Sequence, residues 1–536
     1  MRILILVIGL TLQTSAHSQT VGTLNHEEGT ASGLNLLNPI GHDRTYLIDN
    51  CGRVINDWMT TRPNGMYAEI TPEGTLLKSA QDELTTFFEG GGANGYIQEY
   101  GWNGFLTWEY KISDATHRAH HDMELLANGN LLVIAWEQKS RAECIAAGAD
   151  TNLLHVDGLW TTVIYELERL PFNSANIVWE WHAFDHLVQD FDASQQNYGV
   201  LSANPNKINF NYAADVTNQD WAHVNGIDYN QELDHIVLSS PRFNELWIID
   251  HSTTTQEAAG STGGNRGKGG DLLWRWGNPI TYGQGMVNDQ QLKFQHNSNW
   301  VERGTRYLDM ISVYSNRDDD NGNFVSRVKI IDAAFDTINN EYPIAGSFLP
   351  LVPEYTYQLV DSLFSPRVSG VQVQENDNLL ITSGNNGHHI EVDTAEVLKW
   401  NYLTPIYPNG TIANQGDVLS NSKSSFVMER YPMDFQGFNG QSLAPGSTIE
   451  LGGFNCEPVE ISSNLFEDLS VVPNPLNTEF SIEGGKGMES VRITDAQGRT
   501  IFNQEYFFGT PIDSSSWEDG LYYLQIGESS LKLIKH

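Results

Sequence analysis

One strand pattern recurs along most of this chain and constrains its fold more than any other feature. Each copy holds an apolar strand, a polar turn, and a second strand that ends in aromatic residues. Five copies end at Trp58, Tyr110, Trp181, Trp276 and Tyr402, and RVKIIDAAFDTINNEYPI is a sixth, degenerate copy. Alternating apolar and polar residues predict a β-hairpin in each copy, with further hairpins between them. Two hairpins make a four-stranded sheet, so the pattern predicts an all-β, six-bladed β-propeller.

The repeat stops near residue 460, and a different spacing of strands and turns follows. We expect the propeller to span residues 19–460 and a small β-sandwich to span residues 467–536. Two long inserts, at 182–220 and 252–270, are rich in Asn, Gly, Ser and Thr, which predicts surface loops. The segment GSTGGNRGKGG in the second insert lacks the spacing of a phosphate-binding loop, so it predicts no nucleotide site.

Charge and the N-terminal segment indicate an exported protein. The chain of 536 residues has 67 Asp and Glu against 30 Lys and Arg, a formal net charge of −37. Such a surface repels nucleic acid and anionic lipid, so we expect neither as a partner. Residues 1–18 combine one Arg, a short apolar run and an A-x-S cleavage site, the features of a secretory signal. No apolar stretch is long enough to span a bilayer, which predicts a secreted or cell-surface protein.

The three cysteines cannot all pair with one another. Cys51 lies near the start of the repeat region, Cys456 near its end, and Cys144 between them. The two ends of a closed ring are neighbours, so we expect any bridge to join Cys51 and Cys456. None of the three has C-x-x-C spacing, so they predict no zinc site.

Histidines mark the candidate site. His121, His223, His296 and the pair His388–His389 lie in different copies of the repeat, and equivalent positions of a closed ring meet near its axis. A lone strand histidine is usually a hydrogen-bonded structural residue, but four sites in separate repeats favour a shared function. Three imidazoles could instead bind zinc or copper. Arg242 opposes that alternative, because a fixed cation repels a metal ion.

Several ordered motifs resemble the arylsulfotransferase family. They are HHDMELLANGN, HVNGIDYN with the following SPRFNELWIID, FQHNSN, and SGNNGHHIEVDTAEVLKW, and the resemblance covers roughly residues 30–455. It implies an exported six-bladed propeller that needs no cofactor and moves a sulfuryl group from a phenolic sulfate ester to another phenol. Separately, VVPNPLNTEFSI, ITDAQGRTI and GLYYLQI resemble the C-terminal sorting domain of type IX secretion. That resemblance implies the type IX machinery as a partner and export, via the periplasm, from a Gram-negative bacterium.

The family motifs assign roles to five residues of this chain. The resemblance implies that His296 is the nucleophile, which becomes transiently sulfurylated, and that His121 and His223 bind the sulfuryl group. Asn225 and Arg242 take the positions of the remaining sulfate-binding residues. The tyrosines that line the acceptor site in the family have no identifiable counterpart here, so the natural donor and acceptor stay open.

Three neighbouring features have structural alternatives. His120 competes with His121 for the first position, and we favour His121 because an Asp-x-Glu run follows it directly. Asp122 and Glu124 share one strand face, which indicates sheet structure rather than a catalytic pair. The segment at 317–323, RDDDNGN, lacks the turn glycine and bidentate glutamate of a calcium loop, so we expect a solvated turn.

The residue types suit sulfuryl transfer in two steps. A neutral imidazole can attack sulfur to form a sulfohistidine, which divides one difficult transfer into two and gives ping-pong kinetics. We expect the charge of Arg242 to favour neutral His296 and its planar fork to hold the sulfuryl oxygens. Either His121 or His223 serves as the general acid and base. The rival hypotheses are a metal-dependent hydrolase or lyase on the same scaffold, and a catalytically silent propeller that binds glycan or protein.

Overall fold

The computed structural model describes residues 19–452 apart from 420, and residues 470–535 apart from gaps at 484–487, 496–498, 518–519 and 527–528. The chain divides into two compact units, Met1–Cys456 and Glu457–His536. With 44% strand and 6% helix, it is all-β as predicted. The predicted signal peptide and the predicted Cys51–Cys456 bridge fall outside the described residues, because 1–18 and Cys456 are not among them.

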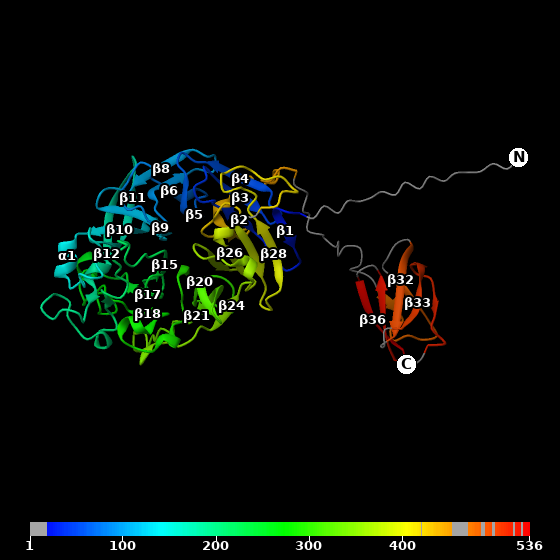
Figure 1. Ribbon diagram of the computed structural model, residues 1–536. Coiled ribbons are helices and arrows are strands. Elements are labelled where there is room, and N and C mark those ends of the chain that lie inside the picture. The colour runs from blue at the N-terminus through cyan, green and yellow to red at the C-terminus, as the bar shows by residue number, and fades with distance from the viewer. Residues whose placement is uncertain are drawn as a thin grey trace. The chain divides into compact units, whose positions relative to one another are not determined.

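Antiparallel sheets follow one another around the centre of the first unit (Figure 1). The described residues of this unit form six sheets of four or five strands, and the first strand of each sheet lies at this centre, where five of them contact one another in chain order. These five strands are β5 (Asn64–Ile70), β9 (His117–Leu125), β15 (Gly226–Asn230), β19 (Gln295–Trp300) and β25 (Gly370–Val373).

Three further strands extend each sheet outward. The sheet that begins with β5 continues through β6 (Leu76–Gln81), β7 (Gly95–Tyr100) and β8 (Leu106–Lys111). The sheet that begins with β9 continues through β10 (Leu131–Lys139), β11 (Leu159–Leu170) and β12 (Ser174–His182). The sheet that begins with β15 continues through β16 (His235–Ser240), β17 (Glu245–Asp250) and β18 (Trp274–Trp276). The sheet that begins with β19 continues through β20 (Ile311–Asp320), β21 (Asn323–Ile331) and β24 (Tyr355–Gln358). The sheet that begins with β25 continues through β26 (Leu379–Ser383), β27 (His388–Val392) and β28 (Leu398–Leu403).

Strands from the two ends of the unit close the ring. The remaining sheet consists of β2 (Leu34–Leu37), β3 (Arg44–Asp49) and β4 (Val54–Met59), with β29 (Glu429–Tyr431) from the other end of the unit as its first strand. The N-terminal β1 (Gly22–His26) pairs with β28 at the outer edge of the preceding sheet. The chain thereby ties its own ends together by strand pairing, which leaves only short outer sheet edges open.

The repeated tryptophans explain why the hairpin pattern recurs. On five outer strands, a buried indole N–H donates to a backbone carbonyl of the next repeat, over 2.6–3.1 Å. The pairs are Trp58 with Gly101, Trp108 with Leu170, Trp181 with Gly270, Trp276 with Pro350, and Trp400 with Asn50. Each tryptophan therefore fills the space between two sheets and satisfies its own polar atom there.

The insert at 182–220 differs from the predicted surface loop. Within it β13 (Leu187–Val188) pairs in parallel with β14 (Ile208–Asn209), and Leu187, Ile208 and Phe210 enter the hydrophobic core. The surface-loop prediction is wrong at these strands, where a few apolar residues suffice for burial. It holds for 190–207 and 211–219, where every residue is exposed or half-buried. The other short elements are α1 (Arg141–Ala146), α2 (Thr255–Ala258), β22 (Ile344–Ala345) and β23 (Ser347–Phe348).

The second unit has two antiparallel sheets and its own core. Phe480, Ile493 and Leu524 belong to one hydrophobic cluster that joins the sheets. One sheet has β30 (Ser470–Val472), β31 (Glu479–Glu483) and β34 (Ile512–Asp513); the other has β33 (Thr500–Phe507), β32 (Met488–Asp495), β35 (Gly520–Ile526) and β36 (Ser529–Lys535).

Candidate active site

Three of the four predicted histidine sites meet at the centre of the first unit. His121 lies in β9, His223 just before β15, and His296 in β19, so they come from three consecutive sheets. The ring centroids of His121 and His223 are 4.7 Å apart, and those of His121 and His296 are 6.4 Å apart. His121 and His296 are buried, whereas 14% of the His223 side chain is exposed. The cluster is therefore reached from the side of His223.

Backbone strain accompanies this cluster. His121, His223 and Phe294 have φ values of 50°, 52° and 54°, in the left-handed region that residues other than glycine seldom adopt. Each such residue costs of order 1–3 kcal/mol, and residues of this kind concentrate at functional sites. Here the strained residues lie just before β15 and β19 and at the register shift within β9, where they turn aromatic rings toward one another.

The hydrogen bonds of Asn316 fix the tautomer of His296. The Asn316 side-chain nitrogen donates to the carbonyls of Ser365 and Val368 over 2.9 and 2.8 Å, so its side-chain oxygen is the atom that faces His296. That oxygen lies 2.7 Å from His296 Nδ1 and can only accept a hydrogen bond. His296 must then carry its proton on Nδ1, which leaves a lone pair on Nε2.

Burial keeps His296 neutral. It lowers the pKa of His296 to about 3, against the opposing effect of the hydrogen bond that His296 donates to Asn316, and the charges of His223 and Arg317 lower the pKa further. We expected the charge of Arg242 to lower this pKa, but the main cause is burial. At neutral pH the imidazole is therefore uncharged, and its Nε2 has the free lone pair that a nucleophile requires.

His223 is held differently, by a carboxylate. Its Nδ1 is hydrogen-bonded to Asp220 Oδ2, and the other oxygen of Asp220 accepts the indole N–H of Trp136 over 2.9 Å. Burial raises the pKa of Asp220, but the charge and hydrogen bond of His223 outweigh it and hold that pKa below its ordinary value. Asp220 thus stays ionised, and it can stabilise a second proton on His223 Nε2.

A cavity of about 370 Å³ opens beside His223. Trp160 and Phe294 supply aromatic walls, and Arg242 lies in the wall as well. The Phe294 ring lies 6.4 Å from the ring of His223 and 5.8 Å from that of His296. These walls suit a flat aromatic ring whose anionic substituent points toward the histidines.

Arg242 is available to bind an anion. It is half-buried, and a second cavity of about 470 Å³ shares it as a wall residue. Among the residues that the structure describes, none forms a salt bridge or hydrogen bond with its guanidinium. The group therefore keeps its planar fork of donors free beside the histidine cluster.

Asn225 is fully buried next to the cluster. Its side-chain nitrogen donates to the carbonyl of Gln295 over 2.9 Å, directly before His296, and its side-chain oxygen has no partner among the described residues. One of its two amide hydrogens is thus committed to the strand that carries His296. To donate a hydrogen bond to a bound sulfate, as predicted, Asn225 must use the other amide hydrogen.

Sequence reasoning missed the glycine loop that covers the histidines. Gly92 has φ of +81°, and a Cβ atom there would lie 2.2 Å from the His121 ring; a Cβ at Gly91 would lie 3.7 Å from His223. The run of three glycines at 90–92 was a visible signal for this close approach. Asp220 has only a weak signal, its place three residues before His223, and Asn316 has none, because it comes from a different strand.

The fourth predicted histidine site does not join the cluster. His388 and His389 lie on β27, the third strand of its sheet. The ring of His389 is hydrogen-bonded to Thr382 and Thr404 over 3.1 and 3.2 Å, and that of His388 to Asn401. Both rings therefore stabilise their own sheet. The expectation that this site reaches the axis is wrong, because only the first strand of each sheet does so.

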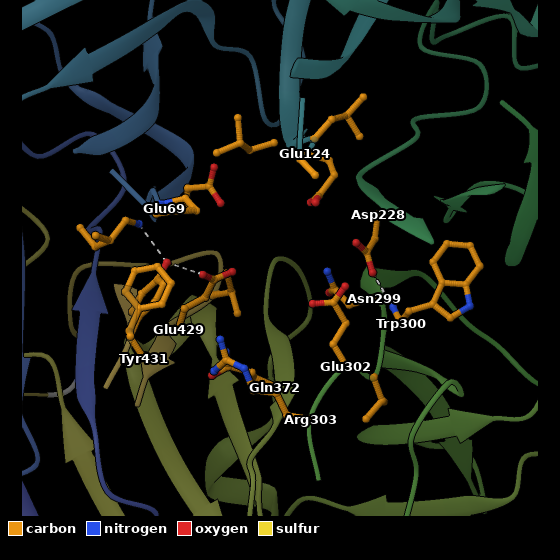
Figure 2. Close-up of a pocket in the computed structure, with 18 of the residues that line it drawn as sticks. Glu69, Glu124, Asp228, Asn299, Trp300, Glu302, Arg303, Gln372, Glu429 and Tyr431 are labelled. Carbon is orange, nitrogen blue, oxygen red and sulfur yellow. Dashed lines mark hydrogen bonds between the residues drawn. The ribbon is translucent and has the colours of Figure 1, made fainter. Parts of the chain in front are cut away.

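Another cavity, of about 440 Å³, is larger than the one beside His223 and richer in acidic side chains. Carboxylates line it, as Figure 2 shows for Glu69, Glu124, Asp228, Glu302 and Glu429. Burial and neighbouring carboxylates raise the pKa of Glu69 to about 8. Glu124 follows His121 on the same strand by three residues, roughly 10 Å. A carboxyl group with a pKa of about 8 is mostly uncharged at neutral pH, so the choice between the cavities rests on His223 and Arg242. We therefore take the histidine cluster as the candidate active site despite the smaller volume of its cavity.

The described residues contain neither a metal-binding cluster nor a membrane-spanning helix. Within them, no three or more His, Cys, Asp or Glu side chains are grouped so that they could hold a metal ion. Among the described helices, none is long and apolar enough to cross a membrane.

Comparison with known proteins identifies two families in this chain. The sequence profile of the arylsulfotransferases matches residues 20–403, and that of the secretion system C-terminal sorting domain matches residues 470–536. The chain belongs to the arylsulfotransferase family. Its sorting domain marks this family member for export to the cell surface or for secretion. No curated protein matches the chain.

Solved structures are similar only at a low level. A protein of unknown function from Bacteroides caccae has 9% identity and a TM-score of 0.39, over 74% of this chain and 98% of that one. Virginiamycin B lyase from Staphylococcus aureus has 9% identity and a TM-score of 0.30, over 70% and 86%. A structure described as the Dos1 propeller has 9% identity and a TM-score of 0.30, over 75% and 88%. No functional conclusion follows from likeness at this level.

Proposed function

We propose that this arylsulfotransferase moves a sulfuryl group from a phenolic sulfate ester to an acceptor phenol, without a nucleotide sulfate donor, through a sulfohistidine at His296. The observation that carries the proposal is the bare Nε2 of His296, fixed by Asn316 and kept neutral by burial. In this proposal the six sheets are the blades of a six-bladed propeller within residues 19–460. The second unit is a β-sandwich that the type IX secretion machinery recognises, within residues 467–536.

The first half-reaction sulfurylates the enzyme. Nε2 of His296 attacks sulfur, the bond from sulfur to the phenolic oxygen breaks, and the electron pair leaves with the phenolate. His223, protonated on both nitrogens and paired with Asp220, donates its Nε2 proton to that phenolate. The products are a phenol, neutral His223, and His296 with a sulfuryl group on Nε2 and its proton still on Nδ1.

The second half-reaction reverses these steps with a different phenol. Neutral His223 removes the hydroxyl proton of the acceptor, whose oxygen attacks sulfur as the bond to His296 Nε2 breaks. The sulfated phenol leaves, and His223 is protonated again. Protons and charge balance over the cycle, and the kinetics are ping-pong. This assigns the general acid and base to His223 rather than to His121, because only His223 contacts a carboxylate and the cavity.

Arg242 stabilises the sulfuryl oxygens during both transfers. A hydrogen bond to a charged group contributes about 1.5–3 kcal/mol, so two bonds from one guanidinium supply about 3–6 kcal/mol. Because about 1.4 kcal/mol corresponds to a factor of ten, the contribution reaches roughly two to four powers of ten in rate if it acts mainly on the transition state. His121 and Asn225 complete the set of donors around the group.

Replacement of the nucleophile tests the proposal. We expect His296→Asn to abolish release of 4-nitrophenol from 4-nitrophenyl sulfate in the presence of phenol, with little change in thermal stability. His389→Asn is the matched control, because it removes another buried imidazole that contacts only its own sheet, and it should remain active. Turnover by His296→Asn at the rate of the unmodified protein would rule out the sulfohistidine.

A further inference from the structure

A second histidine lies directly against His121 and has no part in the mechanism proposed above. His120 precedes His121 on β9, and the Nδ1 atoms of the two rings are 2.8 Å apart. Neighbouring residues of a regular strand point to opposite faces, so this contact needs a distortion. The distortion is present, because His121 has φ of 50° and the pairing of β9 with β10 shifts register at this point.

The short contact contains a single proton. Burial lowers the pKa of His120 to about 3 and places that of His121 well below its ordinary value, so both rings are neutral. Each neutral ring carries one N–H, and one Nδ1 must donate to the other. If His120 donates, His121 carries its own proton on Nε2 and can donate it to a sulfuryl oxygen. If His121 donates, its Nε2 has only a lone pair, which repels such an oxygen.

The surroundings of His120 favour the first arrangement. Its ring is stacked on Trp136, with centroids 3.9 Å apart and planes 9° apart, and its buried Nε2 has no hydrogen-bond partner in the described part of the chain. The carbonyl of Ala135 raises the pKa of His120 but lies outside hydrogen-bonding geometry to Nε2. An unpaired lone pair at Nε2 is more easily tolerated there than an unpaired N–H, which places the proton of His120 on Nδ1.

We propose that His120 is a positioning residue that donates from Nδ1 to His121 and so presents Nε2–H of His121 to the sulfuryl group. This inference rests on the proposed sulfuryl transfer for its purpose, but not for its geometry. The same indole that stacks on His120 donates to Asp220, the partner of His223. Trp136 therefore holds the supports of two histidines in one rigid arrangement.

Two substitutions at position 120, by Asn and by Asp, compare a hydrogen-bond donor with an acceptor of nearly equal size. We expect His120→Asn, whose amide can replace the N–H donor, to keep kcat/KM for 4-nitrophenyl sulfate within about threefold. We expect His120→Asp, which as a carboxylate only accepts, to lose about 10- to 100-fold, the effect of one hydrogen bond to a charged group. Equal activities of the two variants, with equal thermal stabilities, would overturn the proposal. His389→Asn again measures the cost of losing a buried imidazole elsewhere.

A spectroscopic measurement tests the tautomer without any turnover. In protein labelled with 15N-histidine, the chemical shifts of ring nitrogens distinguish protonated from bare atoms. We expect His121 to be protonated at Nε2 in the unmodified protein and at Nδ1 in His120→Asp. A bare Nε2 of His121 in the unmodified protein would refute the positioning role even if His296 proves to be the nucleophile. The expected shifts would support it even if sulfuryl transfer fails.

Discussion

Asn316 offers the deepest test of how the nucleophile is prepared. Asn316→Leu keeps the size of the side chain but removes one acceptor, which faces His296, and two donated bonds, to Ser365 and Val368. The His296 bond is between neutral groups in the resting enzyme, about 0.5–1.5 kcal/mol, and becomes charge-assisted in the sulfurylated enzyme, about 1.5–3 kcal/mol. The difference of about 1–1.5 kcal/mol predicts roughly a tenfold loss of kcat. Without Asn316, His296 can also carry its proton on Nε2, which adds to the loss because that tautomer has no lone pair on Nε2.

The same substitution also destabilises the fold, so a matched control is needed. The loss of three buried hydrogen bonds is expected to cost about 3 kcal/mol. Asn278 is likewise fully buried and donates to Tyr212 Oη and the Phe243 carbonyl over 2.7 and 2.9 Å, but contacts no histidine. We expect Asn278→Leu to lower the melting temperature about as much and to keep kcat. If both variants lose stability and neither loses kcat for 4-nitrophenyl sulfate, the reasoning about the tautomer is wrong.

Three further predictions concern the loop, the acid and the buried charges. Gly92→Ala should abolish activity because its Cβ would overlap the His121 ring, whereas Gly104→Ala, also at φ of +80° but with open space around it, should stay active in the same assay. Asp220→Asn should slow transfer from 4-nitrophenyl sulfate less than transfer from phenyl sulfate, because a poorer leaving group depends more on the proton of His223; equal losses would remove His223 as the acid. Burial raises the pKa of Asp122 to about 8, so the folded protein binds the extra proton, and stability should fall as pH rises from about 4 to 8. Thermal melts between pH 6.5 and 8 should show this decline and a shallower one for Asp122→Asn; an unchanged slope would contradict the assignment.

Local patterns sufficed to predict much of the fold. Alternating residues predicted the hairpins, and the aromatic ends of the copies at Trp58, Tyr110, Trp181, Trp276 and Tyr402 marked outer strands. In each of these strands an indole reaches the next repeat and satisfies its N–H there. The two short buried strands within the insert at 182–220 were not predicted, because their burial depends on a pairing that forms only in three dimensions.

The candidate site likewise has residues that the sequence predicts and residues that it does not. The rings of His121, His223 and His296 come together because each residue lies on, or just before, the first strand of its sheet, a position that repeat spacing indicates. Their supports could not be predicted in this way. Asn316 belongs to β20 and reaches His296 across a strand pair, while Trp136 reaches Asp220 from another sheet. His388 and His389 look the same in sequence, and only their place on a third strand separates them from the site.

The most direct test of the account is the mass of the protein after mixing with 4-nitrophenyl sulfate and no acceptor. We predict an increase by one sulfuryl group, mapped to the peptide that contains His296, absent in His296→Asn and lost when phenol is added. An unchanged mass while transfer to phenol proceeds, or a sulfuryl group on any other residue, would contradict the central claim.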